Sequence, residues 1–389
     1  MKRLLFTTVL AFAPLISAIA QETLRGEDGE PTLVERLTNG KAPKSNVEVN
    51  FQLFTSANAE FTGSELDGMS FKLNRVKLEI KGDVGKNLGY HYRQSFNKYA
   101  DPYSLDNLSS SLELAYVILK PNERLSFSIG KQFVNHGGYE YYVNPIRVRE
   151  FSEFNNLLAC YQAGVSMNWM VTPNNELCFQ VLNNRESHDD DIYASGLPEG
   201  VSKAKVPFMY TANWNSFFMD RALQFRYAMA VGQQAGNKYA YHFTCGNIYE
   251  KGPILAYVDV MYTRQDLDQH GMVSRLPREY QTAKNTEYLS VIGDIDYRIN
   301  RKWNIYVKGA YETARVFKAN GDFRKGLYRR SWNAQSSIEF FPFKQLDLFV
   351  FALYTYRGVI LEKAAKTMGA IEPDTHRISL GLVYSIPIF

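Results

Sequence analysis

Basic residues share one parity in an early segment of the chain, at Arg75, Lys77 and Lys81. Side chains two residues apart point to the same face of a β-strand. A ring of fixed positive charge in a narrow, partly desolvated gap lowers the energy of an anion that passes through it. The pattern therefore predicts a surface along which anions can pass. Glu79 has the same parity, so a mixed-charge wall that simply faces water is the alternative.

Signatures of catalysis and metal binding are missing from the sequence. It contains no G-x-S-x-G, H-E-x-x-H or C-x-x-C motif. The run from His188 to Asp191 lacks the spaced ligands and the glycine of a calcium loop, so we interpret it as a solvated loop tip. We predict no catalytic residues, no cofactor and no metal site. The 44 basic and 40 acidic residues leave a net charge of +4, which gives no support to nucleic-acid binding.

The element that must position the charges is a strand, repeated many times. Between Asn46 and Phe389 we count about sixteen strand-length segments of alternating apolar and polar residues, the signature of an outer-membrane barrel. In the first segment, Val47, Val49 and Phe51 share one face. We predict an all-β fold, a transmembrane antiparallel β-barrel. The alternation slips between Leu73 and Arg75, which predicts a bulge there.

The connections between segments alternate in length, as expected for barrels with tight periplasmic turns and long external loops. The tight turns are predicted at 83–87, 121–124, 172–176, 215–221, 249–252, 300–302 and 342–345. The longer connections are predicted at 57–68, 99–109, 135–159, 184–206, 264–286, 315–329 and 357–375, with a short exception at 233–238. This sorting favours a barrel over a soluble β-sandwich.

The N-terminus predicts export. Lys2 and Arg3 precede an apolar stretch, and small residues at Ala18 and Ala20 form a cleavage pattern, so residues 1–20 are predicted to be a signal peptide. Residues 21–45 are rich in Gly, Pro and charges and are predicted to be a flexible periplasmic leader. The barrel then occupies residues 46–389. We expect it in the bacterial outer membrane, in contact with lipid.

Two stretches resemble a known family. The residues from Phe71 to Gly82, FKLNRVKLEIKG, are similar to the basic second-strand motif of the phosphate-selective porin O and P family. The residues from Ala115 to Phe133 resemble the fourth strand, turn and fifth strand of that family. The resemblance covers about the first third of the chain. It implies sixteen strands, usually a trimer, and a loop after strand five, here 135–159, that folds inward to narrow the pore.

The predicted function is diffusion of small hydrophilic solutes or ions through the barrel, with selection of anions such as phosphate as the sharper hypothesis. The pore-lining candidates are Arg75, Lys77, Lys81, Arg93, Arg147, Arg149, Arg226, Lys308 and Arg377. Acidic residues predicted to face inward are as numerous as these bases, so the sequence does not establish anion selectivity. The alternatives are an outer-membrane barrel enzyme that hydrolyses lipid or peptide, and an adhesin-like barrel with a closed lumen.

Overall fold

The computed structural model describes residues 47–97, 111–143, 147–184, 192–193 and 195–388. Outside these residues lie the predicted signal peptide (1–20), the predicted leader (21–45), the whole connection predicted at 99–109, and the run from His188 to Asp191. Phe389 is also outside them.

The described chain forms sixteen strands and two short helices. The strands are β1 (Val47–Thr62), β2 (Glu65–Val84), β3 (Leu88–Ser95), β4 (Leu112–Asn122), β5 (Leu125–Phe133), β6 (Tyr161–Thr172), β7 (Asn175–Asn183), β8 (Phe208–Phe218), β9 (Leu223–Ala235), β10 (Lys238–Lys251), β11 (Ile254–Leu267), β12 (Lys284–Arg298), β13 (Trp303–Val316), β14 (Gly326–Phe340), β15 (Asp347–Leu361) and β16 (Thr375–Pro387). The helices are α4 (Glu153–Asn156) and α6 (Lys363–Thr367).

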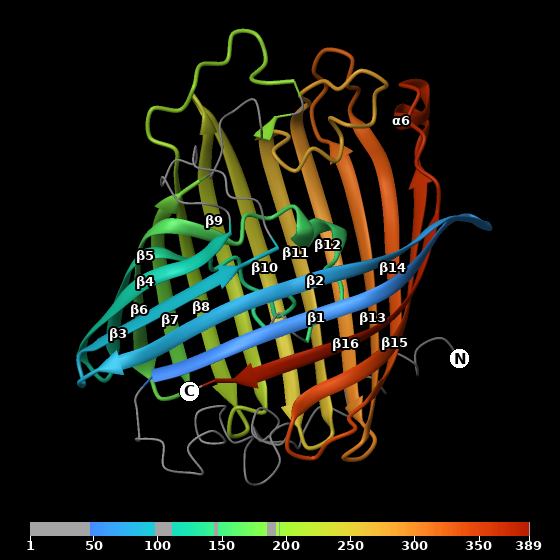
Figure 1. Ribbon diagram of the computed structural model, residues 1–389. Coiled ribbons are helices and arrows are strands. Elements are labelled where there is room, and N and C mark those ends of the chain that lie inside the picture. Colours follow the sequence, from blue (N-terminus) through green and yellow to red (C-terminus); the bar gives the residue numbers. More distant parts are fainter. Residues whose placement is uncertain (1–46, 98–110, 144–146, 185–191, 194, 389) are drawn as a thin grey trace, which may run out of the picture.

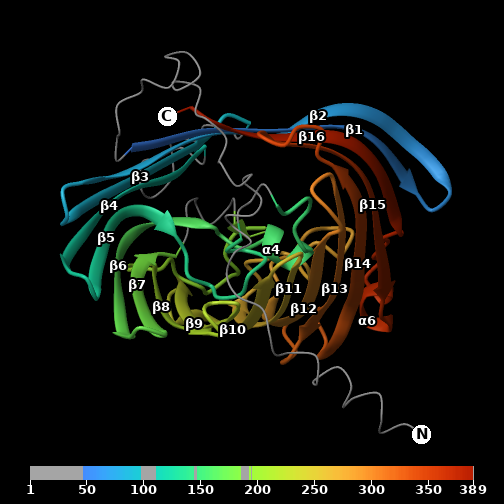
Figure 2. The ribbon, with the colours of Figure 1, turned by 90° about the horizontal axis from the view of Figure 1, so that it is seen from below.

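The strands close into one barrel in sequence order (Figures 1 and 2). Each strand pairs with its chain neighbours in antiparallel fashion, and β1 pairs with β16, for example at Leu53↔Tyr384. Closure leaves every strand with a partner on both sides, which is the condition for a sheet to cross a lipid bilayer. The prediction of an all-β antiparallel barrel of sixteen strands is confirmed.

The period of two sets which side chains face the lumen. On β13, Trp303, Ile305 and Val307 are exposed on the outer surface, whereas Asn304 and Tyr306 between them and Lys308 after them are buried toward the inside. The same alternation continues on β10, β11 and β14. The outer surface therefore presents an apolar band, and the polar residues gather inside.

The predicted tight turns lie on one side of the barrel, and the longer connections that the structure describes lie on the other. The bulge is also confirmed, because Phe54 pairs with Arg75 while Thr55 pairs with Leu73. The long connection predicted at 57–68 is wrong, since β1 continues to Thr62 and β2 begins at Glu65. Polar residues in this stretch suggested a loop. Backbone pairing does not require apolar side chains, and Gly63, with φ of +57°, allows the tight turn.

Neither helix is long. α4 lies in the connection between β5 and β6, and α6 in the connection between β15 and β16. Within the described residues, no helix has the length and apolar character needed to cross a membrane. Figure 2, which looks along the barrel, shows α4 within the ring of strands.

Candidate functional site

The connection between β5 and β6 enters the lumen, and we call its described residues, 134–143 and 147–160, the inward loop. Its contacts are with strands on the far side of the barrel. The backbone N–H of Phe154 donates to Glu312 on β13 at 2.8 Å, and the Arg149 Nε donates to Glu339 on β14 at 2.7 Å. The inward loop therefore lies across the interior and against the wall formed by the later strands.

A tight turn at Gly137 and Gly138 brings the inward loop to this wall. Both glycines have positive φ, +78° and +76°. A Cβ atom at position 137 would lie only 2.7 Å from the Cβ of Ala228 on β9. Directly after the turn, the carboxylate of Asp259 accepts hydrogen bonds of 2.8–2.9 Å from the backbone N–H groups of Tyr139 and Glu140. Asp259 is fully buried and fixes the entry of the inward loop.

Buried ion pairs hold the middle of the inward loop. Lys308 on β13 pairs with Glu140, and both side chains are fully buried. The Lys308 Nζ also donates to the carbonyl of Glu150 at 2.6 Å, and Ser152 donates to Glu140 through its N–H and its hydroxyl. Arg377 on β16 pairs with the carboxylate of Glu150. Two predicted pore bases thus bind the inward loop.

Arg149 supplies a third attachment from the inward loop itself. Its guanidinium pairs with the buried Glu339 and lies over the ring of Phe349 at 4.6 Å and that of Tyr306 at 5.5 Å. Asn304 donates to the second oxygen of Glu339 at 3.0 Å. Because a buried charge is tolerated only when it is paired and hydrogen-bonded, this arrangement favours one position of the inward loop.

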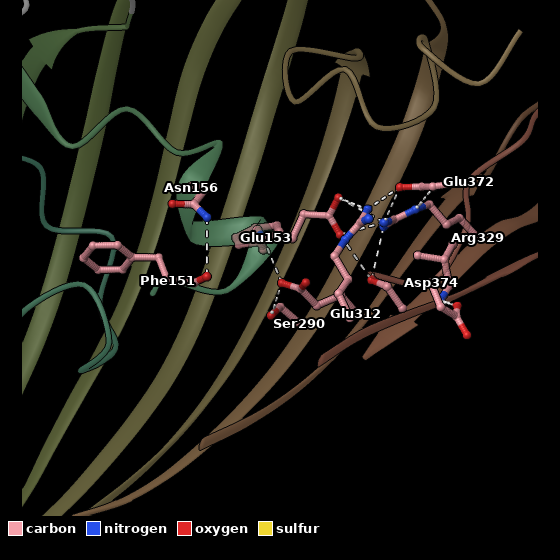
Figure 3. Close-up of polar contacts among 12 residues, drawn as sticks. Phe151, Glu153, Asn156, Ser290, Glu312, Arg329, Glu372 and Asp374 are labelled. Atoms are coloured by element: carbon pink, nitrogen blue, oxygen red, sulfur yellow. Dashed lines mark hydrogen bonds and ion pairs between the residues drawn. The ribbon is translucent and has the colours of Figure 1, made fainter. Parts of the chain in front are cut away.

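Figure 3 shows a four-residue ion-pair network at the tip of the inward loop. Glu153 on α4 contacts Arg329 on β14 at 2.8 Å and Arg357 on β15 at 3.1 Å. Both arginines also pair with Glu372, in the external connection before β16. Partial burial opposes ionisation of Glu372, but Arg329 and Arg357 outweigh it and lower the pKa of this carboxyl. The network joins the inward loop to an external loop.

Comparison with known proteins decides the family. The model of the family described as phosphate-selective porin O and P matches residues 46–386. The chain belongs to this family of porins. It is a diffusion porin of the bacterial outer membrane. A search of curated proteins gives no match.

Solved structures show the same fold at low sequence identity. The porin is similar to an anion-selective porin from Comamonas acidovorans, with a TM-score of 0.58, 10% identity, and coverage of 88% of this chain and 100% of that chain. For OmpF of Salmonella typhi in complex with daunomycin, the TM-score is 0.57 and the identity 12%, with coverage of 88% of this chain and 98% of that chain. For OmpT of Vibrio cholerae, expressed in the outer membrane, the TM-score is 0.53 and the identity 11%, with coverage of 89% of this chain and 99% of that chain.

Two of the predicted bases form a buried cluster on the early strands of the porin. Lys77 on β2 and Arg93 on β3 both contact the carboxylate of Glu113 on β4, at 2.8 and 2.9 Å. Arg93 also donates to the hydroxyl of Tyr161 at 2.7 Å. Glu113 is fully buried, and Glu79 lies 3.6 Å from Arg93, so two carboxylates offset the charges of these two bases in the lumen.

Two other predicted bases lie apart from that cluster. Lys81 is at the end of β2 near the tight turn, where it pairs with Glu48 at 2.8 Å and stays half exposed. Arg75 lies next to the bulge, with its guanidinium 5.5 Å from the ring of Phe54 and 5.4 Å from the ring of Phe151 in the inward loop. Arg75 therefore lies between the early strands and the inward loop, whereas Lys81 belongs to the rim.

The remaining predicted bases lie at the edges of the inward loop. Arg147 contacts Glu250 on β10 at 3.4 Å. Arg226 on β9 is 8% exposed, and its guanidinium lies 3.5 Å from the ring centre of Tyr142 in the inward loop. No carboxylate in the described part of the chain forms an ion pair with Arg226, and its Nε has no hydrogen-bond partner there. Arg226 thus differs from the other buried bases.

Sequence reasoning missed the network of Figure 3. Arg357 and Glu372 fall within the connection predicted at 357–375, so neither was considered as a lumen residue. Arg329 is followed by Arg330, and two adjacent arginines hide which of them faces inward. The structure buries Arg329 and leaves Arg330 half-buried. Extending the alternation of β14 upward from Ser337 would have assigned Arg329 to the inside.

Aromatic stacking buries histidines around α4. Phe154 stacks on His242 of β10 and on His270 of the β11–β12 connection, with ring centroids 5.9 and 5.0 Å apart. His136, at the start of the inward loop, packs edge-to-face against His242 and donates from Nε2 to the carbonyl of Ala159 at 3.0 Å. Groups of three or more His, Cys, Asp or Glu placed to hold a metal are not found in the described residues.

We expect acid to loosen the inward loop. Burial lowers the pKa of His136 to about 4 and that of His270 to about 3, below the ordinary 6.5. Between pH 6.5 and these lowered pKa values, the histidines are protonated when the loop is released and neutral when it is attached. The released loop therefore binds more protons than the attached loop. The contribution of these two neutral histidines to attachment is therefore complete above pH 6.5 and decreases as the pH falls toward 4, by about 1.4 kcal/mol per histidine and pH unit.

The measurement is the single-channel conductance of the porin as the pH is lowered. We expect fluctuations between conductance levels to begin in the acidic range. The variant His136→Gln cannot gain this charge, so its fluctuations should begin at lower pH. An identical onset in both proteins would contradict the assignment to His136.

Proposed function

We propose that this diffusion porin passes small hydrophilic solutes with a weak preference for anions, set between the inward loop and β9. The proposal rests on how the inward loop divides the charges of the lumen. The observation that carries it is the buried guanidinium of Arg226, which has no ion-pair partner in the described residues.

The inward loop covers carboxylates of the later strands. Asp259, Glu312 and Glu339 are 0%, 3% and 1% exposed, because backbone N–H groups or Arg149 of the inward loop lie directly on them. A carboxylate that is covered and hydrogen-bonded contributes less to the potential in the passage than one facing water in it. Covering this wall supports a passage along the early strands.

Arg226 lies at the margin of the covered wall, in register with Asp259 of β11 through Gly246 of β10. Its cross-strand neighbour on β8 is Asn215, an uncharged residue. Tyr142, which lies next to Arg226, is 54% exposed and therefore borders open space. A guanidinium at such a border offers an anion both charge and hydrogen-bond donors. Arg75, between the bulge and Phe151, adds positive charge on the early wall.

The test is the reversal potential of purified porin in a planar bilayer under a potassium chloride gradient. We expect Arg226→Gln to shift the potential toward cation preference, because a fixed positive charge is lost from the passage. Lys81→Gln is the matched control, since it removes one positive charge from the rim and should change the potential less. An unchanged potential in Arg226→Gln would contradict the proposal.

Phosphate selectivity is the narrower form of the proposal. Repeating the measurement with phosphate as the anion separates the two forms. A current that phosphate blocks in the natural protein but not in Arg226→Gln would support a phosphate site, whereas equal currents with chloride and phosphate would indicate general anion preference. We also propose a non-enzymatic role and a homotrimer, the latter testable by native mass spectrometry in detergent.

A further inference from the structure

Two arginines and a glutamate form a row on the outer surface of the barrel. Arg264 on β11 pairs in register with Glu287 on β12, and Glu287 with Arg315 on β13. Arg315 Nε lies 3.0 Å from Glu287, and the hydroxyl of Tyr262 donates to the same carboxylate at 2.8 Å. We call Arg264, Glu287 and Arg315 the arginine row. One carboxylate between two guanidinium groups leaves the row with a net positive charge.

The arginine row faces outward. Along β11, Arg264 continues the exposed column of Val258 and Val260, while Met261 and Thr263 between them are buried inside. Along β13, Arg315 likewise continues the column of Val307 and Tyr311. The row therefore belongs to the surface that meets lipid, and not to the lumen.

The arginine row lies where the apolar band ends. Tyr262 lies directly below Arg264 on the outward column of β11. On β13, Tyr311 lies four residues below Arg315, beyond Thr313, and pairs with Trp332 on β14. Aromatic residues of this kind mark the boundary between hydrocarbon and headgroups. Two residues along a strand span about 6.6 Å, so Arg264 lies just beyond this boundary. Because the long connections are on this side, the boundary is the external one.

Further bases surround the row. The connection between β13 and β14, residues 317–325, carries exposed Lys318, Arg324 and Lys325 against one acid, Asp322. The guanidinium of Arg264 lies 3.9 Å from the ring centre of Phe317, at the start of this connection. This contact holds Arg264 beside the external surface.

The outer wall of the strands differs between sectors, although exposed bases also lie in other external connections, such as Lys203 and Lys205 between β7 and β8. Strands β6, β7 and β8 contain no Lys or Arg at any position. Their outer surface instead carries apolar and aromatic residues such as Val165, Phe179 and Tyr210 up to the external end. An anionic partner at headgroup height beside β11 to β13 would account for the two arginines on this part of the strand wall.

We propose that the arginine row binds the phosphate groups of a phosphorylated lipid in the outer leaflet of the membrane. The apolar band contacts the acyl chains, and the tyrosines below the row lie at the boundary with the headgroups. The guanidinium groups donate paired hydrogen bonds to phosphate oxygens. Arg315 is 46% exposed and Arg264 is exposed, so both can contact a headgroup from the side. Glu287 orients Arg315, and Phe317 orients Arg264.

The experiment measures lipid retention by native mass spectrometry on the purified, full-length porin in its own oligomeric state. The probes are a bisphosphorylated diglucosamine glycolipid, its dephosphorylated analogue and inorganic phosphate. We expect the phosphorylated glycolipid to bind and the variant Arg264→Gln/Arg315→Gln to bind it about tenfold more weakly, since charge-assisted contacts are lost. The control Lys363→Gln/Lys366→Gln, which removes two exposed bases from α6 at the same rim, should bind as the natural protein does.

Three outcomes would overturn the proposal. Equal binding of the phosphorylated and dephosphorylated glycolipids would show that phosphate is not recognised. Equal binding by the arginine variant and the natural protein would remove the row from the site. Displacement of the glycolipid by an equal concentration of inorganic phosphate would indicate a site for a free anion. Single-channel conductance should be unchanged in the arginine variant, and this readout separates lipid binding from the passage of solutes.

Discussion

Replacement of Lys308 by methionine is expected to release the inward loop and to increase the single-channel conductance. The substitution leaves the fully buried Glu140 without its ammonium partner and removes the hydrogen bond to the carbonyl of Glu150. Leaving one member of a buried ion pair unpaired costs about 3–5 kcal/mol. The inward loop can avoid this cost by moving Glu140 into water. Conductance in a planar bilayer measures the change.

The double variant Lys308→Met/Glu140→Gln provides the control for Lys308→Met. Without the carboxylate no buried charge remains, so we expect a conductance closer to that of the natural porin. Lys325→Met, at an exposed position between β13 and β14, should have no effect on conductance. If Lys308→Met conducts like the natural protein, the ion pair does not hold the inward loop.

The second large effect is expected for Gly137→Ala. The position has φ of +78°, which costs an L-residue about 1–2 kcal/mol, and the new methyl group would lie 2.7 Å from the Cβ of Ala228. Overpacking of this kind adds about 1–3 kcal/mol. The turn can relieve the contact only by moving away from β9, which also pulls Tyr139 away from Asp259. We expect unstable conductance levels and faster proteolysis within the inward loop.

Gly252→Ala is the matched control. Gly252 also has a positive φ, +56°, but a Cβ atom there would meet nothing within 4 Å. Both variants therefore share the backbone strain, and only Gly137→Ala has the steric contact. Equal proteolysis and equal conductance in the two variants would mean that the contact with Ala228 does not position the inward loop.

The location of the strands and of the bulge could be predicted because they follow from local alternation. Arg226, Lys308 and Arg377, which were predicted as pore-lining candidates, contact residues of the inward loop. The connection at 57–68 was predicted wrongly because its polar residues resemble a loop, while backbone pairing extends beyond the apolar band. The ion pairs of the predicted bases could not be predicted from the alternation. Lys77 and Arg93, for example, both pair with the buried Glu113 of a neighbouring strand.

The sequence by itself determined the barrel, the inward side of each strand and the membrane that the protein enters. These follow from the period of two along the strands and its outer-membrane signature, which are local properties of the chain. Only the tertiary structure decided which charges meet. Arg149 and Glu339 are 190 positions apart, and Tyr139 and Asp259 are 120 apart. Such pairs depend on barrel closure and on the path of the inward loop, which no local pattern encodes.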